Sequence, residues 1–314
     1  MMEDFRTLLA AMGTLIIDGA LATELEARGH NLDHPLWSGI VLRDRPKAIQ
    51  EVHLNYYVAG ADIAITASYQ ASPRGLKEHF NMNDDEAANL IKDSVKLAQQ
   101  ARYEAYGQGI ERRLLVAGSV GPLGAYLADG SEYRGDYERT GEEFKAFHRP
   151  RIAALVDAGA DLLAVETMPK FEEIQAILEL LSDEFPTAIG WVSCTLKDAK
   201  HLSDGTRLED LLKHLERHAN QVVAAGVNCI PSDLAQGALE HMRPLTNLPL
   251  VCYPNSGETW DAENHKWLGR ESNADIVKQA LKWEDAKAKL IGGCCRTGPR
   301  YLEVISSALA AGHV

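Results

Sequence analysis

The sequence predicts an α/β protein in which eight parallel β-strands, joined by helices, close into a single, somewhat distorted (β/α)8 barrel. Short apolar runs rich in β-forming residues alternate with longer segments whose apolar residues recur at helical spacing. The predicted strands are almost continuously apolar, which is typical of a parallel sheet covered by helices. A length of 314 residues is ordinary for one such barrel, so we expect residues 1–314 to form one domain.

Each predicted strand is an apolar run that ends at a glycine or a polar residue. Strands are expected at residues 14–17, 62–65, 114–117, 162–165, 188–192, 222–225, 250–253 and 289–291. Helices are expected at residues 49–59, 144–158, 171–181, 208–218 and 276–283. Gly60 and Gly159 follow the first two of these helices, as is common at helix C-termini. An open doubly wound sheet is the alternative, but no glycine-rich nucleotide loop follows the first strand.

Two connecting segments are expected to be active-site loops. Residues 123–140, after the third strand, are polar and rich in tyrosine and glycine. Residues 256–272, after the seventh strand, are a second candidate lid. Long connections of this kind at the carboxyl ends of barrel strands commonly cover the site.

Composition disfavours several classes of partner. The formal net charge of −13 makes nucleic acid and anionic membranes poor partners, whereas a cationic substrate is tolerated. No apolar run reaches the roughly 18 residues that span a bilayer. Residues 1–6 are charged and lack the apolar core of a signal peptide. We therefore expect a cytoplasmic protein, where grouped thiols indicate metal binding or catalysis more often than disulfides.

Three of the five cysteines follow predicted strands in a pattern that indicates a metal site. Cys229 follows the sixth strand, and Cys294 and Cys295 follow Gly292 and Gly293 after the eighth. Three thiolates with an open fourth position suit a zinc ion that takes part in chemistry. The two glycines are expected to give the chain the freedom to turn both thiols to one side. The alternatives are one core and one incidental cysteine, or a Cys294–Cys295 disulfide.

The other two cysteines are expected to lie outside this site. Cys252 is inside an apolar strand and is expected to be a small buried apolar side chain. Cys194 also follows a strand, but it is a weaker candidate for a metal ligand than the other three cysteines.

Polar residues also end the other predicted strands. Asp18 and Glu166 each follow an apolar run, where a carboxylate loses water unless it meets a cation. We therefore expect them to bind the ammonium group of an amino-acid substrate, with a helix or loop cap as the alternative for each. Thr66, at the end of the second strand, is a further candidate substrate-binding residue.

The chain resembles the homocysteine S-methyltransferase family over nearly its full length. The resemblance is carried by residues 18–25, 67–71, 118–122, 166–167, 226–229, 253–257 and 292–297. The Gly-Val-Asn-Cys and Gly-Gly-Cys-Cys segments within this set are highly specific when they occur together. Residues 125–137 and 201–205 are most similar to the bacterial enzymes of the family that use S-methylmethionine.

This resemblance implies a zinc enzyme with Cys229, Cys294 and Cys295 as protein ligands and homocysteine sulfur as the fourth. It also implies that Asp18 and Glu166 hold the amino group of homocysteine. The expected reaction moves a methyl group from a sulfonium, S-methylmethionine or S-adenosylmethionine, to the zinc-bound thiolate of homocysteine, giving methionine. No catalytic residue is expected beyond that thiolate, because the leaving thioether departs neutral.

Two other functions remain open at this point. One is a betaine–homocysteine methyltransferase, and the other is a non-catalytic zinc-binding protein, although a structural zinc site normally has four protein ligands. Selenocysteine or selenohomocysteine would be an alternative methyl acceptor. Among aromatic residues, Trp37, Tyr69, Tyr126 and Tyr133 are candidates for cation–π contact with a sulfonium.

Overall fold

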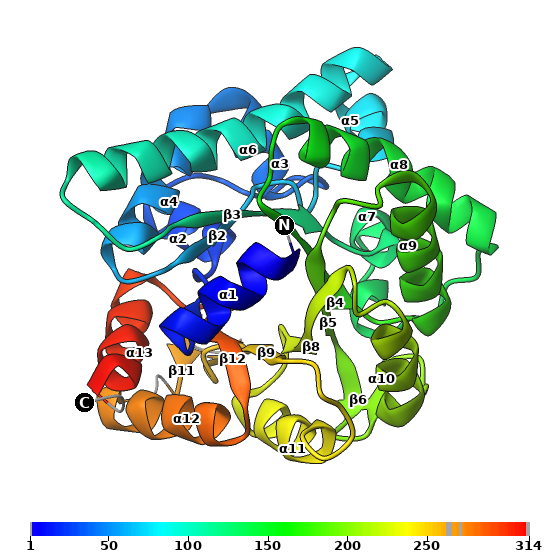
Figure 1. Ribbon diagram of the computed structural model, residues 1–314. Helices are drawn as coiled ribbons and strands as arrows, with labels where there is room; N and C mark the ends of the chain where they lie inside the picture. The colour runs from blue at the N-terminus through cyan, green and yellow to red at the C-terminus, as the bar shows by residue number, and fades with distance from the viewer. Residues whose placement is uncertain (1, 262–265, 270–271, 312–314) are drawn as a thin grey trace.

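Eight parallel strands form the central sheet of the protein. The structure is a computed structural model that describes residues 2–261, 266–269 and 272–311. The order of the strands is β1-β12-β9-β8-β5-β4-β3-β2, so each strand lies beside its neighbours in the expected sequence of a barrel (Figure 1). Their bounds are β1 Leu15–Ile16, β2 Ile63–Ile65, β3 Leu115–Val120, β4 Leu162–Met168, β5 Gly190–Cys194, β8 Val222–Asn228, β9 Leu250–Tyr253 and β12 Ala288–Ile291. The predicted strands are confirmed to within a few residues.

The two ends of the sheet meet and close the barrel. Ile17 and Ile63 form a single parallel bridge between the segments that contain β1 and β2. Asp62 N donates to Ile16 O at 2.7 Å, and Asp18 N donates to Ile63 O at 2.9 Å. Few hydrogen bonds join these two segments, because β1 and β2 have only two and three residues. The closed barrel predicted from the sequence is therefore confirmed.

Alternating side chains of the strands divide the core into two layers. The inner layer fills the barrel with residues such as Leu15, Leu115 and Trp191, and the outer layer packs between the strands and the surrounding helices. Helix α1, Met2–Met12, lies across the centre of the ring of strands in Figure 1. Its Phe5 joins the inner layer, so the helix covers the end of the barrel opposite to the strand carboxyl ends.

Helices surround the sheet. The predicted helices correspond to α4 Pro46–Val58, α8 Gly141–Asp157, α9 Phe171–Glu184, α10 Leu208–Arg217 and α12 Asn273–Asp285. Further helices are α2 Leu21–Ala27, α3 Ser38–Asp44, α5 Pro73–Phe80, α6 Asp84–Gly107, α7 Leu123–Leu127, α11 Ser232–Met242 and α13 Pro299–Ala311. Capping boxes begin α6, α8 and α12, in which the side chains of Asn83, Thr140 and Ser272 accept from backbone N–H groups of the first turn.

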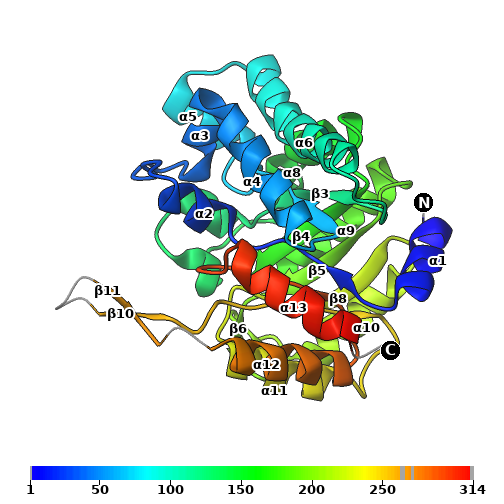
Figure 2. The ribbon, with the colours of Figure 1, turned by 90° about the vertical axis from the view of Figure 1, so that its left-hand side faces the viewer.

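The two expected loops have structure of their own. The segment 123–140 contains α7 and the 3-10 helix η1, Ser131–Tyr133, and these two pieces pack on one another. The segment 256–272 contains the antiparallel strands β10, Thr259–Asp261, and β11, Lys266–Leu268, which project away from the barrel in Figure 2. Residues 262–265 and 270–271 of that candidate lid lie outside the described residues.

Within the described ranges, no helix combines the length and the apolar character needed to cross a membrane.

Candidate active site

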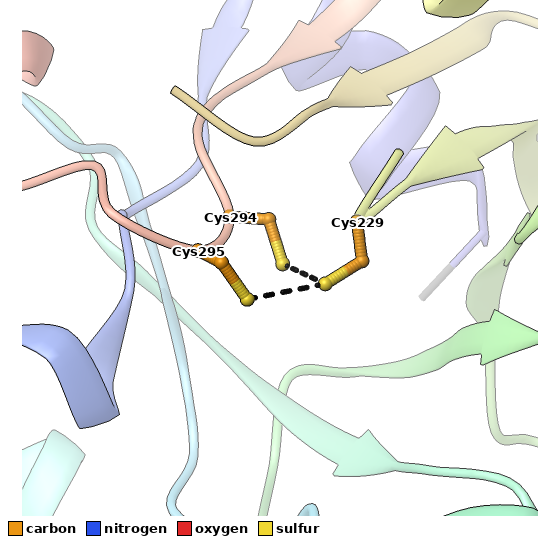
Figure 3. Close-up of side chains that lie close together, drawn as sticks. All are labelled: Cys229, Cys294 and Cys295. Carbon is orange, nitrogen blue, oxygen red and sulfur yellow. Dashed lines mark hydrogen bonds between the residues drawn. The ribbon is translucent and has the colours of Figure 1, made fainter. Parts of the chain in front are cut away.

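Three cysteine sulfurs meet at the carboxyl ends of β8 and β12. Cys229 follows β8, and Cys294 and Cys295 follow β12 (Figure 3). The Sγ atom of Cys229 lies 2.7 Å from that of Cys294 and 3.5 Å from that of Cys295. All three are free thiols, so the alternative of a Cys294–Cys295 disulfide is not what the structure contains. The three sulfurs lie within 4.8 Å of one another, and the cluster could hold a metal ion.

Unusual backbone conformations turn the cysteines toward one another. Cys229 has φ 56° and Arg296 has φ 68°, both in the left-handed region that residues with a side chain seldom occupy. The sequence predicted that Gly292 and Gly293 give the chain freedom to turn. Neither glycine has a positive φ, so this prediction does not explain why both positions are glycine. A Cβ at Gly292 would lie 2.7 Å from Ile17 O, and one at Gly293 would lie 2.3 Å from Thr297 Oγ1. Close packing therefore excludes side chains at both positions.

The thiols influence the ionisation of one another. Hydrogen bonding to Cys229 and Cys294 lowers the pKa of the Cys295 thiol well below its ordinary value. Hydrogen bonding to Cys229 and Cys295, together with burial, raises the pKa of Cys294. One thiolate is thus stabilised by its neighbours, while the remaining sulfurs need a cation before they ionise. This is the electrostatic behaviour expected of a cluster that is completed by a metal ion.

The sulfurs open into a cavity of about 790 Å³ that is lined by acidic and aromatic residues. Its acidic residues are Asp18, Asp33, Glu132 and Glu166. No lysine or arginine is found among the described residues that line it. A cavity with this lining favours cationic or zwitterionic ligands over anions.

Glu166, near the end of β4, is held by two hydroxyl groups, and among the described residues no cation contacts it directly. Ser119 Oγ donates to Glu166 Oε1 at 2.5 Å, and the Tyr253 hydroxyl donates to Oε2 at 3.0 Å. Tyr253 is itself positioned by Trp191 Nε1, at 3.0 Å, and by Ser193 Oγ, at 2.6 Å. Burial raises the pKa of Glu166 to about 7, against the lowering effect of the two hydroxyl donors. A cation bound beside Glu166 would restore its ionised form.

Asp18 lies at the closure between β1 and β2, and none of the residues that the structure describes gives it a charged partner. Its Oδ2 accepts from Ile65 N at 2.9 Å and lies 3.9 Å from His53 Nδ1. Burial lowers the pKa of His53 to about 4, so this imidazole is neutral at pH 7. Burial likewise raises the pKa of Asp18. Asp18 and Glu166 are therefore two buried carboxyl groups in one cavity, and Glu166 further raises the pKa of Asp18.

The hydroxyl group of Thr66 lines the cavity but is already engaged in hydrogen bonds. Thr66 Oγ1 accepts from Ser119 N at 2.9 Å. Ser68 Oγ donates to Ser119 O at 2.8 Å, so the 2.7 Å contact between the two hydroxyls uses the proton of Thr66. The visible role of Thr66 is thus to hold the backbone of Ser119, whose side chain positions Glu166.

The candidate aromatic residues divide into two groups. Trp37, Tyr69 and Tyr133 line the cavity, and the Tyr133 hydroxyl lies 3.7 Å from Cys229 Sγ. Tyr126 is outside the lining, which corrects the expectation that it contacts a ligand. Its hydroxyl donates to Glu78 at 2.6 Å, and the guanidinium of Arg74 lies over its ring.

The two remaining cysteines are separate from the sulfur cluster. Cys194 and Cys252 are fully buried in the outer layer between strands and helices. Burial raises the pKa of both thiols, which agrees with their interpretation as small apolar side chains. Neither belongs to the metal-binding group found among the described residues.

Sequence reasoning missed three residues of the site. Tyr253 could have been found, because strand alternation places it on the same inward face as Val251. Asn228 immediately precedes Cys229 and bonds to Thr167, but only the structure shows that contact. Glu132 lies in a segment without strand or helix periodicity, and no sequence signal points it into the cavity.

Comparison with known proteins agrees with this arrangement. The family model described as "Homocysteine S-methyltransferase" matches residues 15–309. The homocysteine S-methyltransferase of Escherichia coli (strain K12) is 53% identical over 304 residues, which are 96% of this chain and 97% of that protein. YbgG of Bacillus subtilis (strain 168), also named a homocysteine S-methyltransferase, is 43% identical over 98% of both chains.

A solved structure is similar over nearly the whole chain. The metallated form of the homocysteine methyltransferase MmuM from Escherichia coli matches with a TM-score of 0.88 and 50% identity, covering 96% of this chain and 98% of that one. The residues matched by the family model, 15–309, include the three cysteines and both buried carboxyl groups. The chain belongs to the homocysteine S-methyltransferase family.

Proposed function

We propose that this protein transfers a methyl group from a sulfonium donor to the sulfur of homocysteine, giving methionine, and that it does so with a zinc ion held by Cys229, Cys294 and Cys295. The observation that carries the proposal is the placement of three converging thiols and two buried carboxyl groups, Asp18 and Glu166, around one cavity. Residues 1–314 would act as one domain, since the strands of the single barrel extend from Leu15 to Ile291.

The donor set fits zinc. Three thiolates are soft ligands that zinc prefers, and three protein ligands leave a position for substrate. The solved Escherichia coli relative exists in a metallated form. A bound zinc ion would supply a Lewis acid that lowers the pKa of an incoming thiol, while the three anionic ligands keep the centre electron-rich. The presence of five free cysteines suits a reducing cytoplasm.

The residues of the chain would bind and orient the acceptor. Asp18 and Glu166 would take the α-ammonium group of homocysteine, which supplies a positive charge in direct contact with both carboxyl groups. Ser119 and Tyr253 fix the Glu166 carboxylate, and Thr66 holds Ser119 in place. Contacts from both Asp18 and Glu166 to the ammonium group would direct the thiol of homocysteine toward the cysteines.

The main task of the protein in the reaction is to align the acceptor sulfur, the methyl carbon and the donor sulfur. After the thiol of homocysteine has released its proton to solvent, a lone pair of the thiolate sulfur attacks the methyl carbon, and the electrons of the breaking carbon–sulfur bond return to the donor sulfur. The donor leaves as a neutral thioether, so no general acid is needed. Alignment of the two sulfurs with the methyl carbon contributes up to about 7–11 kcal/mol in well-oriented systems. Tyr69 and Tyr133 line the cavity, and their rings would attract a sulfonium cation bound there.

Turnover with different donors tests this proposal. Zinc-loaded protein would be given homocysteine with S-methylmethionine, S-adenosylmethionine or betaine, each in a separate assay, and methionine would be measured. We expect methionine with a sulfonium and not with betaine. Methionine formed only with betaine would replace the proposed donor, and no turnover with any donor would reject the reaction. Selenocysteine offered in place of homocysteine would show whether the acceptor site admits a selenolate.

A further inference from the structure

We infer that Glu132 binds the α-ammonium group of the methyl donor and so selects sulfonium donors that are amino acids. This inference rests on the proposed function, because it assigns the donor half of the same cavity. It concerns an acidic residue separate from Asp18 and Glu166, which lie at the ends of other strands.

Glu132 lies in the lining of the cavity that contains the cysteine cluster. It is the central residue of η1, in the segment after β3, and it lines the same cavity as the cysteines. The next residue, Tyr133, has its hydroxyl 3.7 Å from Cys229 Sγ. Glu132 and the cysteine cluster therefore line one cavity, and the neighbouring Tyr133 contacts the cluster directly. In S-methylmethionine three carbons separate the sulfonium from the α-nitrogen, so a donor with its methyl group toward the cysteines would place its ammonium group at another part of the cavity lining.

The backbone of Glu132 is held rigidly. Thr195 Oγ1 donates to Glu132 O at 3.1 Å, which ties η1 to the end of β5. Helix α7 packs so closely on η1 that a Cβ at Gly124 would lie 2.5 Å from Glu132 N. Because its backbone is already held, Glu132 loses less entropy when a ligand fixes its side chain.

One carboxyl oxygen of Glu132 lacks a partner. Oε2 is buried and accepts no hydrogen bond from any described residue. The nearby cation, Arg134, is directed to Asp136 Oδ2 at 2.8 Å and to Asp129 O at 3.0 Å. Burial raises the pKa of Glu132, as expected for a carboxyl group without a counter-charge. A buried polar atom without a partner in a ligand cavity indicates a contact that the ligand provides.

The α-ammonium group is a better partner for Glu132 than the sulfonium. A sulfonium loses its positive charge as the methyl group leaves, so a carboxylate beside it would stabilise the bound donor more than the transition state. An ammonium group keeps its charge throughout the reaction, and a carboxylate can bind it without slowing the transfer. Aromatic rings such as Tyr133, whose attraction for a cation is weaker, are suited to the sulfonium itself.

Calorimetry with two matched ligands tests the assignment. The ligands are S-methylmethionine and 4-(dimethylsulfonio)butanoate, which differ only in the α-ammonium group, titrated into zinc-loaded protein. In Glu132→Gln we expect the dissociation constant of S-methylmethionine to rise about 10- to 100-fold, the range of a charge-assisted hydrogen bond. The dissociation constant of 4-(dimethylsulfonio)butanoate should change by less than about twofold in the same variant. The KM of homocysteine should also stay unchanged.

The matched control is Glu138→Gln, the same substitution in the same segment at a side chain that is 92% exposed. It should leave both dissociation constants unchanged. Equal weakening of both ligands by Glu132→Gln, no weakening of either, or a raised KM for homocysteine alone would overturn the inference. Wild-type protein that transfers no methyl group from any sulfonium would instead reject the proposed function, so the two failures are distinguishable.

Discussion

Asn228 and Thr167 exchange two hydrogen bonds across the mouth of the barrel. Asn228 Oδ1 accepts from Thr167 N at 2.8 Å, and Asn228 Nδ2 donates to Thr167 Oγ1 at 2.8 Å. Thr167 directly follows Glu166, and Asn228 directly precedes Cys229. Thr167 and Cys229 both have a left-handed backbone, with φ 59° and 56°. The side chain of one residue thus supports two strained positions, one beside the amino-group site and one within the sulfur cluster.

Replacing Asn228 with alanine should therefore weaken both halves of the site. The variant loses two buried hydrogen bonds and leaves Thr167 N without its partner, which costs about 2–4 kcal/mol of unfolding free energy. We also expect weaker zinc binding and a higher KM for homocysteine. Chemical denaturation, zinc titration and steady-state kinetics would measure these effects. Thr167→Ser keeps the hydroxyl and both bonds, so a Thr167→Ser variant as impaired as Asn228→Ala would contradict the role given to this pair.

Each of the three clustered cysteines should be necessary for zinc. Cys229→Ser, Cys294→Ser and Cys295→Ser each remove one of three thiolate ligands, and we expect loss of stoichiometric zinc and of methyl transfer with the barrel still folded. Metal analysis, circular dichroism and turnover would be measured together. Cys194→Ser and Cys252→Ser are the controls and should keep full zinc content, because both lie in the outer layer. Full zinc content in a variant of the cluster would remove that residue from the site.

Glu166 should make the stability of the substrate-free protein depend on pH. The pKa of Glu166 is about 7 in the folded protein and about 4.5 for the free side chain. Below pH 4.5 the carboxyl group is protonated in both the folded and the unfolded protein, and its burial then carries no penalty for a buried charge. As the pH rises from 4.5 to 7, the unfolded chain releases this proton while the folded protein still holds it, so the free energy of unfolding decreases. The expected loss is about 3 kcal/mol. Urea denaturation between pH 4.5 and 8 would measure it.

Glu166→Gln cannot titrate, so the difference in unfolding free energy between wild type and this variant should change with pH over the same interval. A difference that stays constant would mean that Glu166 does not carry the raised pKa. Homocysteine should reverse the effect in the wild type, because its ammonium group favours the ionised carboxylate.

A buried ionic network fixes the segment that carries Glu132. Arg151 Nη2 donates to His148 Nδ1 at 3.0 Å, and His148 Nε2 therefore carries the proton that it donates to Glu173 Oε1 at 2.7 Å. Glu173 also accepts from Leu123 N at 2.7 Å and from the Tyr137 hydroxyl, one near each end of the segment 123–140. Arg151→Met removes the guanidinium of this buried network and leaves His148 Nδ1 and the carbonyl of Gly121 without their donor, so we expect a loss of about 3–5 kcal/mol.

Arg149→Met is the matched control on the same helix. Arg149 pairs with Glu184 at 2.9 Å, but both side chains are about 40% exposed, so its removal should cost less than about 1 kcal/mol. Thermal and urea unfolding of both variants would give the comparison. Similar losses for the two arginines would contradict the structural importance assigned to the buried network.

Much of the site could be predicted because strand ends are local features. Apolar runs that lead into Asp18, Glu166 and the segment before Cys229 indicate where strands approach their ends, and parallel strands in a closed barrel bring their carboxyl ends to one rim. The same reasoning could not find Glu132, because a short 3-10 helix in a polar connection has no periodic pattern. It also placed Tyr126 near the ligand, whereas Arg74 and Glu78 hold that ring at the surface.

The order of apolar runs along the chain was enough to determine the barrel, the rim that carries the cysteines, and the two carboxyl groups there. Only the tertiary structure decided that Gly292 and Gly293 are small for reasons of packing, that the hydroxyl of Thr66 is engaged by Ser119 and Ser68, and that Glu132 reaches the cavity. The physical reason is that periodicity depends on neighbours along the chain, whereas these contacts join residues brought together by strand register and by the packing of connections on the rim.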